Sequence, residues 1–159
     1  MRMHHQLPKV NATIASSARV AIVTAQFNGE YTASLERHCV AALQQAGLAH
    51  DRVETFAVPG ALEIPVVAKR LAASGKFSAI IALGVVIKGE TYHFELVANE
   101  SARGCQQVAL ETGVPVIMEI LACYTEAQAV ARCSNGQHNK GREAAAAAIA
   151  MLNLLPKLR

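Results

Sequence analysis

Four short apolar runs, each followed by a segment with helical spacing, limit the fold of this chain more than any other feature of its sequence. They lie at residues 19–24, 52–58, 78–87 and 114–120. A strand that is apolar along its whole length is buried on both faces, which is typical of a parallel sheet covered by helices. The run at residues 78–87 is the most apolar, so we expect it to lie in the middle of the sheet.

The segments between these runs have the periodicity of helices. The pattern predicts helices at residues 31–45, at 62–74, from just after Thr91 to about 112, at 126–132 and at 142–155. Because crossovers between parallel strands are right-handed, this alternation predicts a single three-layer αβα domain of flavodoxin-like topology with a four-stranded parallel sheet. We expect the domain to span residues 18–159, after a polar N-terminal tail at residues 1–17.

The composition excludes several classes of protein. Of 159 residues, 52% are hydrophobic and 17% charged, which excludes disorder for nearly all of the chain. The net charge of +3 is too small and too evenly spread for a nucleic-acid-binding surface. No stretch has the roughly 18 apolar residues of a membrane-spanning helix, and the first residues lack the apolar stretch of a signal peptide. We therefore expect neither a nucleic-acid partner nor a membrane.

The four cysteines favour a cytoplasmic location. They are Cys39, Cys105, Cys123 and Cys133, which lie far apart and form no CxxC pair. We expect reduced, partly buried thiols, with neither a disulfide framework nor a zinc site.

Unusual residues follow the first two predicted strands, and ligands of parallel α/β sheets bind beyond the carboxyl ends of the strands. Phe27 is an aromatic residue in a polar loop, in a chain with only 4% aromatic residues. Its ring either fills the loop against the core or offers a flat face to a heterocycle. Glu63 lies in an apolar segment, and its carboxylate either binds ligand hydroxyl groups or interacts with a helix N-terminus.

The end of the third strand is a candidate anion site. Gly89, Glu90 and Thr91 stand where this strand passes into a helix, and backbone N–H groups at a helix start bind phosphate or carboxylate. His93 lies in the same turn and is either a structural histidine or an acid–base group beside the anion.

A basic loop follows the last predicted strand and its helix. It carries Arg132, His138, Lys140 and Arg142 among Asn and Gly residues. The loop is either a solvated basic surface or a second set of donors for a phosphate, in which Arg132 could bind two oxygens at once.

Several segments together resemble the lumazine synthase family. They are Phe27–Asn28, VPGALEIP at residues 58–65, LGVVIKGETYHF at 83–94 and NKG at 139–141, and the resemblance extends from about residue 20 to 155. It implies a flavodoxin-like fold and the penultimate step of riboflavin biosynthesis. In that step 5-amino-6-ribitylamino-2,4-pyrimidinedione condenses with 3,4-dihydroxy-2-butanone 4-phosphate to give 6,7-dimethyl-8-ribityllumazine.

The resemblance also implies roles for individual residues. The pyrimidine and its ribityl chain would be bound by Phe27, Ala61, Leu62, Glu63, Val85, Val86, Ile87 and Met118. The butanone phosphate would be bound by Glu90, Thr91, Arg132 and Lys140, while His93 would carry protons. Met118, Arg132 and Lys140 would come from a neighbouring subunit, since the family forms homopentamers that can pair as decamers or close into 60-subunit shells. Gln26, Lys88 and Met118 depart from the family's common residues.

The implied chemistry requires neither a metal nor a cofactor. The 5-amino group attacks the ketone, phosphate leaves from the imine, and the ring closes with loss of water, so every step is a proton transfer or an elimination. We therefore expect a cytoplasmic transferase. Two other hypotheses stay open: a module that binds a lumazine-like or flavin-like compound without turnover, and a cage-forming structural protein.

Overall fold

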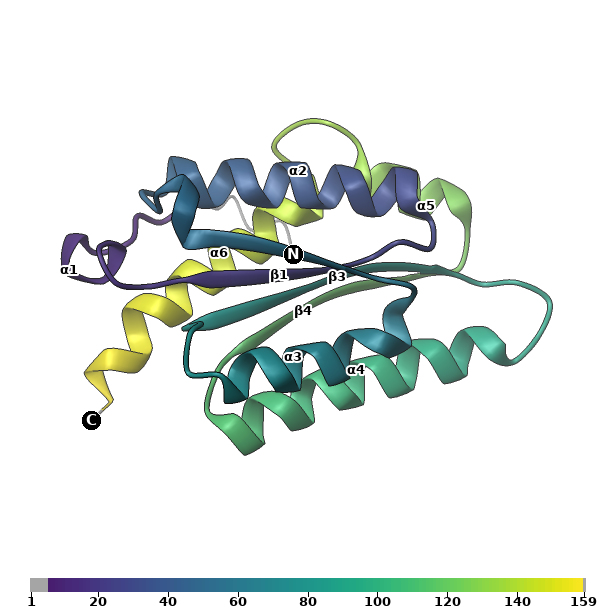
Figure 1. Cartoon of the computed structure of the whole chain (residues 1–159). Helices are drawn as coiled ribbons and strands as arrows, with labels where there is room; N and C mark the ends of the chain where they lie inside the picture. Colours follow the sequence, from purple (N-terminus) through teal and green to yellow (C-terminus); the bar gives the residue numbers. More distant parts are fainter. Residues whose placement is uncertain (1–5, 159) are drawn as a thin grey trace.

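A computed structural model describes residues 6–158 and contains a parallel sheet of four strands in the order β2-β1-β3-β4 (Figure 1). The strands are β1 (Val20–Ala25), β2 (Val53–Val58), β3 (Ala79–Ile87) and β4 (Val116–Cys123). The parallel sheet and the central position of β3 are confirmed. Burial along the whole strand holds for β1 and most of β3 only, because β2 and β4 are edge strands with several exposed positions.

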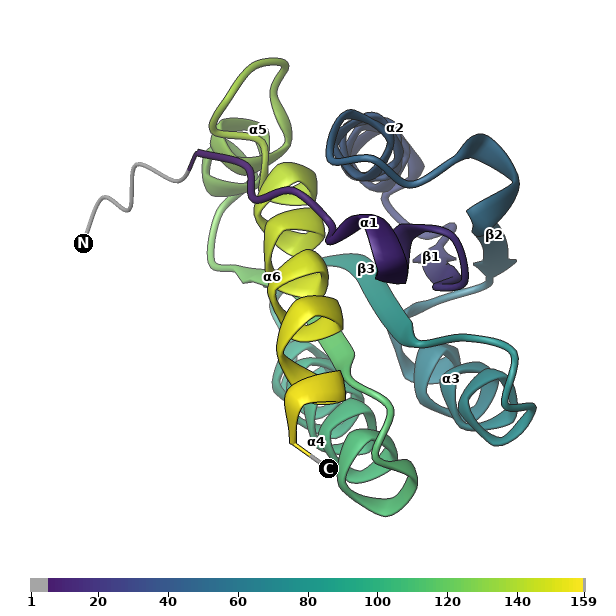
Figure 2. The same cartoon turned by 90° about the vertical axis from the view of Figure 1, so that its left-hand side faces the viewer.

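Helices cover both faces of the sheet, which confirms the three-layer flavodoxin-like fold (Figures 1 and 2). One face carries α2 (Gly29–Gln45), α5 (Glu126–Cys133) and α6 (Lys140–Leu154), and the other carries α3 (Ile64–Ala73) and α4 (His93–Thr112). A short helix α1 (Ala12–Ala15) and 3-10 turns η1 (His50–Arg52), η2 (Ala61–Glu63) and η3 (Leu155–Lys157) complete the elements. Within residues 6–158, none of these helices combines the length and the apolarity needed to cross a membrane.

Most elements begin or end one to three residues from their predicted bounds, and two of these differences have a clear physical cause. β4 continues to Cys123 instead of ending at residue 120, because its last residues pair with Val85, Val86 and Ile87 of β3. α6 begins at Lys140 instead of residue 142 because Asn139 caps it, with its side-chain oxygen accepting from the N–H of Gly141 at 2.8 Å. The basic loop therefore ends before Lys140, which belongs to the helix.

The segment before β1 packs against the domain. Val10 is 8% exposed, and its N–H donates to the carbonyl of Ala46 at 3.0 Å. Asn153 of α6 accepts from the N–H of Asn11 at 3.1 Å and donates to the carbonyl of Lys9 at 2.9 Å. Residues 6–17 of the predicted polar tail are therefore joined to α2 and α6, whereas residues 1–5 and Arg159 lie outside the described residues.

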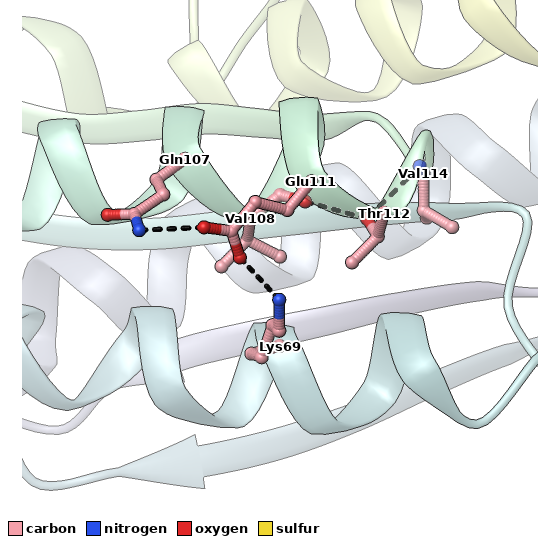
Figure 3. Close-up of polar contacts among 6 residues, drawn as sticks. All are labelled: Lys69, Gln107, Val108, Glu111, Thr112 and Val114. Atoms are coloured by element: carbon pink, nitrogen blue, oxygen red, sulfur yellow. Dashed lines mark hydrogen bonds and ion pairs between the residues drawn. The ribbon is translucent and has the colours of Figure 1, made fainter.

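Contacts between α3 and α4 fix the position of α4, whose first residue is His93. A Cβ on Gly104 of α4 would lie 2.7 Å from Pro65 Cγ of α3, so the two helices approach this closely only at a glycine. Lys69 of α3 donates to Glu111 of α4, which also accepts from Gln107 Nε2 at 2.8 Å (Figure 3). The bond from Lys69 holds the pKa of Glu111 below its ordinary value.

The four cysteines are free and fully buried, whereas the sequence predicts thiols that are only partly buried. Burial raises the pKa of Cys105 and of Cys133 to about 11. Because the thiolate is the reactive form of cysteine, these two side chains are poor nucleophiles at neutral pH.

Candidate functional site

A pocket of about 610 Å³ opens at the carboxyl ends of β1, β2 and β3, where the sequence places its unusual residues. Nine predicted site residues line it together: Phe27, Ala61, Leu62, Glu63, Val85, Val86, Ile87, Thr91 and His93. Its remaining lining residues are Ala25, Pro59, Gly60, Gly89, Phe94 and Val97. The walls are thus mostly apolar, with Glu63, Thr91 and His93 as the polar side chains.

Phe27 follows the end of β1 by two residues and is 73% exposed. Its N–H donates to the carbonyl of Pro59 at 3.1 Å, which ties this loop to the end of β2. The next residue, Asn28, has a φ of 57° and donates from Nδ2 to the carbonyl of Val85 at 2.7 Å. Asparagine tolerates this left-handed conformation better than most residues. The Phe27 ring is thereby presented to solvent beside the pocket, which excludes the alternative that it fills the loop against the core.

The second wall is the turn η2, which carries Ala61, Leu62 and Glu63. It lies close to β3, since a Cβ on Gly84 would be 3.6 Å from that of Ala61 and 3.3 Å from Ile120 Cγ2. The N–H of Glu63 donates to the carbonyl of Gly60 at 3.2 Å. The Glu63 carboxylate is exposed to the pocket, where it is free to accept from hydroxyl groups of a ligand.

The third wall combines the end of β3 with the first turn of α4. His93 is the first residue of this 20-residue helix, and Thr91 precedes it by two residues. The first backbone bond of this helix runs from the N–H of Glu95 to the carbonyl of Tyr92 at 3.1 Å. The N–H groups of the residues that precede Glu95 have no partner within the helix. With the positive end of the helix dipole, they make this turn suitable for an anion.

A cluster of charged and aromatic side chains holds the start of α4 beside the sheet. Lys88 Nζ, at the end of β3, lies 3.9 Å from Glu95 Oε1 and 5.7 Å from the ring centre of Tyr124. The Tyr124 ring in turn lies 6.0 Å from that of Phe94. Each contact of a half-exposed ion pair is worth at most about 1 kcal/mol, but together they connect the turn that carries His93 to the ends of β3 and β4.

Four predicted site residues do not line the pocket. Glu90 is exposed between Gly89 and Thr91, and Met118 is 43% exposed on the edge strand β4. Arg132 of α5 donates to the carbonyl of Gln128 at 3.0 Å, and Lys140 of α6 pairs with Glu143 at 2.7 Å. Figures 1 and 2 show α5 and α6 on the opposite side of the sheet from α4. Within one chain, therefore, neither Arg132 nor Lys140 reaches the pocket.

The arrangement suits the binding of a flat, hydroxylated molecule near an acid–base group. No residue lining the pocket in the described part of the chain is a lysine or arginine. Among residues 6–158, no group of three or more His, Cys, Asp and Glu side chains could hold a metal ion. Phe94 and Val97 were not assigned to the site from the sequence: Phe94 was only the last residue of the 83–94 segment, and the only signal of Val97 was its helical spacing after His93.

The fold and the site together define the class of this protein. It is a parallel αβα domain with a ligand pocket beyond the carboxyl ends of its strands. The sequence profile described as 6,7-dimethyl-8-ribityllumazine synthase matches residues 17–156. The chain belongs to this family, so the resemblance noted from its motifs is confirmed.

Three relatives illustrate how far the similarity extends, each carrying the name 6,7-dimethyl-8-ribityllumazine synthase. One from Thermococcus onnurineus is 48% identical over 139 residues, which are 87% of this chain and 90% of the relative. One from Paraburkholderia phymatum is 46% identical over 136 residues, or 86% and 77% of the two chains. One from Coxiella burnetii is 43% identical over 143 residues, or 90% and 95%.

Proposed function

We propose that the chain catalyses the condensation of 5-amino-6-ribitylamino-2,4-pyrimidinedione with 3,4-dihydroxy-2-butanone 4-phosphate. The observation that carries this proposal is the convergence of Phe27, Glu63 and His93 on one mostly apolar pocket. Membership of the 6,7-dimethyl-8-ribityllumazine synthase family supports the same reaction. The enzyme is a transferase, and the reaction uses no metal and no cofactor.

The pocket holds the pyrimidine and its ribityl chain. The exposed Phe27 ring stacks on the heterocycle, and Val85, Val86 and Ile87 border its edge with their backbone groups. The Glu63 carboxylate accepts from the ribityl hydroxyl groups, next to Ala61 and Leu62. This places the 5-amino group toward the first turn of α4.

His93 moves the protons of the reaction. It accepts a proton as the amine attacks the ketone, and returns one as water leaves from the carbinolamine and later from the closing ring. An imidazole suits both directions because its two forms coexist near neutral pH. Thr91 and the backbone N–H groups of Glu90 and of the first turn of α4 face the phosphate, whose departure as a dianion they favour.

A neighbouring subunit completes the site. A phosphate dianion needs cations, and the pocket has none within the described part of its own chain. Arg132, Lys140 and Met118 therefore act on the pocket of the next copy in a ring, where Arg132 binds the phosphate. Exposed Phe27, Leu62, Tyr92 and Leu96 give the pocket's rim an apolar surface of the kind that subunit contacts cover. We propose a homo-oligomer built from pentamers, acting in the cytoplasm.

An absorbance assay for lumazine formation from the two purified substrates tests the reaction. The proposal predicts turnover without added metal or cofactor and release of one phosphate per lumazine. A fluorescent ligand that binds without turnover would instead identify a binding module. Light scattering of the same sample gives the number of subunits, and a monomer with full activity would contradict the shared site.

A further inference from the structure

The loop between α5 and α6 is attached to α2 at both of its ends through one hydroxyl group. Ser34 Oγ of α2 donates to the carbonyl of Cys133 at 2.5 Å and accepts from Asn139 Nδ2 at 3.3 Å. Ser34 is 6% exposed and Asn139 is 1% exposed, so water does not compete for these bonds. We call these three residues the Ser34 clasp.

Asn139 uses every polar group of its side chain. Nδ2 also donates to the carbonyl of Ser134 at 3.0 Å, while Oδ1 accepts from the N–H of Gly141 at 2.8 Å. Its backbone N–H donates to the carbonyl of Gly136 at 3.3 Å. A buried amide paired in this way specifies one conformation of the loop, because any other would leave a buried polar group without a partner.

The first turn of α6 is pressed against α2 beside the clasp. A Cβ on Gly141 would lie 2.1 Å from the carbonyl oxygen of Leu35, the residue after Ser34. Only glycine permits this approach, so the start of α6 has almost no freedom to slide along α2.

Two basic residues lie next to the ends of the clasp. Arg132 precedes Cys133, and Lys140 follows Asn139. Their side chains contact nearby residues of their own helices, Gln128 and Glu143 respectively. The position of the backbone therefore determines which positions the two cationic groups can occupy. The clasp joins these two stretches of backbone to the same atom of α2.

We propose that Ser34 and Asn139 are positioning residues that hold Arg132 and Lys140 at the separation needed to bind one phosphate together. This inference rests on the proposed function, in which both cations serve the neighbouring subunit's pocket. Preorganised donors bind a dianion better than mobile ones, because less conformational entropy is lost on binding. The clasp therefore increases the affinity for the phosphate-bearing substrate and does not change the affinity for the pyrimidine.

Ser34→Ala tests the clasp, with Tyr31→Phe as the matched control. Tyr31, also on α2, donates to Glu126 of α5 at 2.6 Å, so its variant loses a bond between the same two helices outside the clasp. We expect Ser34→Ala to raise the KM for the butanone phosphate about 3- to 10-fold and to leave the pyrimidine KM unchanged. We expect Tyr31→Phe to change neither KM. A lower melting temperature in both variants with no selective change in KM would overturn the proposal.

Asn139→Asp provides a second, independent test. The aspartate keeps the oxygen that caps α6 but loses the two amide donors, so the same selective rise in KM is expected. In an Arg132→Ala background, Ser34→Ala should produce a smaller fold-change than in the wild type, because part of its effect passes through Arg132. Equal fold-changes in both backgrounds would count against the clasp.

Hydrogen exchange over residues 134–141 separates failure of the clasp from failure of the proposed function. Unchanged exchange in Ser34→Ala overturns the clasp, whatever the kinetics. Faster exchange than in Tyr31→Phe, combined with an Arg132→Ala variant whose butanone KM is normal, supports the clasp and overturns the assignment of Arg132 to the phosphate.

Discussion

The pocket lies at the carboxyl ends of the strands, the α5–α6 region lies on the face of the sheet opposite α4, and the two are built by different means. The pocket has apolar walls with a carboxylate and an imidazole, and no cation among its lining residues in the described part of the chain. The α5–α6 region carries Arg132 and Lys140 and is fixed to α2 by the buried polar contacts of Ser34 and Asn139. The first suits a heterocycle with hydroxyl groups and the second a phosphate, so a reaction between such substrates needs both.

The two regions also owe their geometry to different physical causes. In the pocket, the parallel sheet brings the ends of β1, β2 and β3 together, and Asn28 and Gly84 adjust the spacing. In the α5–α6 region the helices pack on the sheet, but the connection between them is fixed to α2 by the buried hydrogen bonds of Ser34 and Asn139. Substitutions in the two regions should accordingly impair different properties of the protein.

The largest expected effect belongs to the pocket. His93→Ala should lower kcat about 100-fold, because loss of a positioned acid–base group costs 10²- to 10⁴-fold and substrate positioning survives. Steady-state kinetics with both substrates measure this, and His50→Ala, exposed in η1, is the control. An unchanged kcat would mean that His93 is a structural residue and that the pocket does not supply the acid–base chemistry.

A substitution in the α5–α6 region should weaken substrate binding. Arg132→Ala should raise the KM for the butanone phosphate about 10- to 40-fold, since a bond to a charged group is worth roughly 1.5–3 kcal/mol and this side chain is exposed. The pyrimidine KM should change little. Arg103→Ala, an exposed arginine of α4 that pairs with Glu100, controls for loss of a surface charge. Equal changes in both KM values would place Arg132 away from the phosphate.

Mixing two defective chains tests whether the regions of different copies cooperate. His93→Ala and Arg132→Glu chains should each be poor alone, but co-expressed rings contain interfaces with an intact His93 facing an intact Arg132. With random 1:1 assembly about a quarter of interfaces have this composition, so about a quarter of wild-type activity should return. Activity no greater than the average of the parents, in rings shown to contain both chains, would mean that each site lies within one subunit.

Most of the pocket could be predicted from the sequence because the signals there are local. Apolar runs such as residues 78–87 identify buried strands, and the rule that ligands bind beyond strand ends then selects Phe27, Glu63 and His93. The sheet brought these three residues to one pocket as expected. Their roles in catalysis, and those of Arg132 and Lys140, remain predictions.

The α5–α6 region could not be derived in the same way. Ser34 and Asn139 are ordinary polar residues in the sequence, and their meeting depends on how α6 packs against α2. The start of α6 was misjudged for the same reason, because Asn139 appeared as part of a polar loop and not as a cap. The extra residues of β4 were missed because their pairing partner, the end of β3, is distant in sequence.

Glu119 on β4 gives the smallest expected effect and tests the electrostatics of the α5–α6 region. The pKa of its carboxyl group is raised to about 7, mainly by burial; the Lys140 cation opposes this rise and the Glu143 carboxylate adds to it. A carboxyl group with a folded-state pKa above its unfolded value favours the folded state when protonated. Its unfavourable contribution therefore grows as the pH rises from about 4.5 to about 7.

Glu119→Gln should consequently stabilise the protein more at pH 8 than at pH 5, by about 1 to 3 kcal/mol in the free energy of unfolding. Urea denaturation at both pH values and one fixed protein concentration measures the difference, since assembly also affects stability. In a Lys140→Met background the gain at pH 8 should be larger, because the cation that eases ionisation of Glu119 is gone. A gain that is independent of pH would mean that Glu119 is ionised throughout this range, and that Lys140 already neutralises it before any phosphate binds.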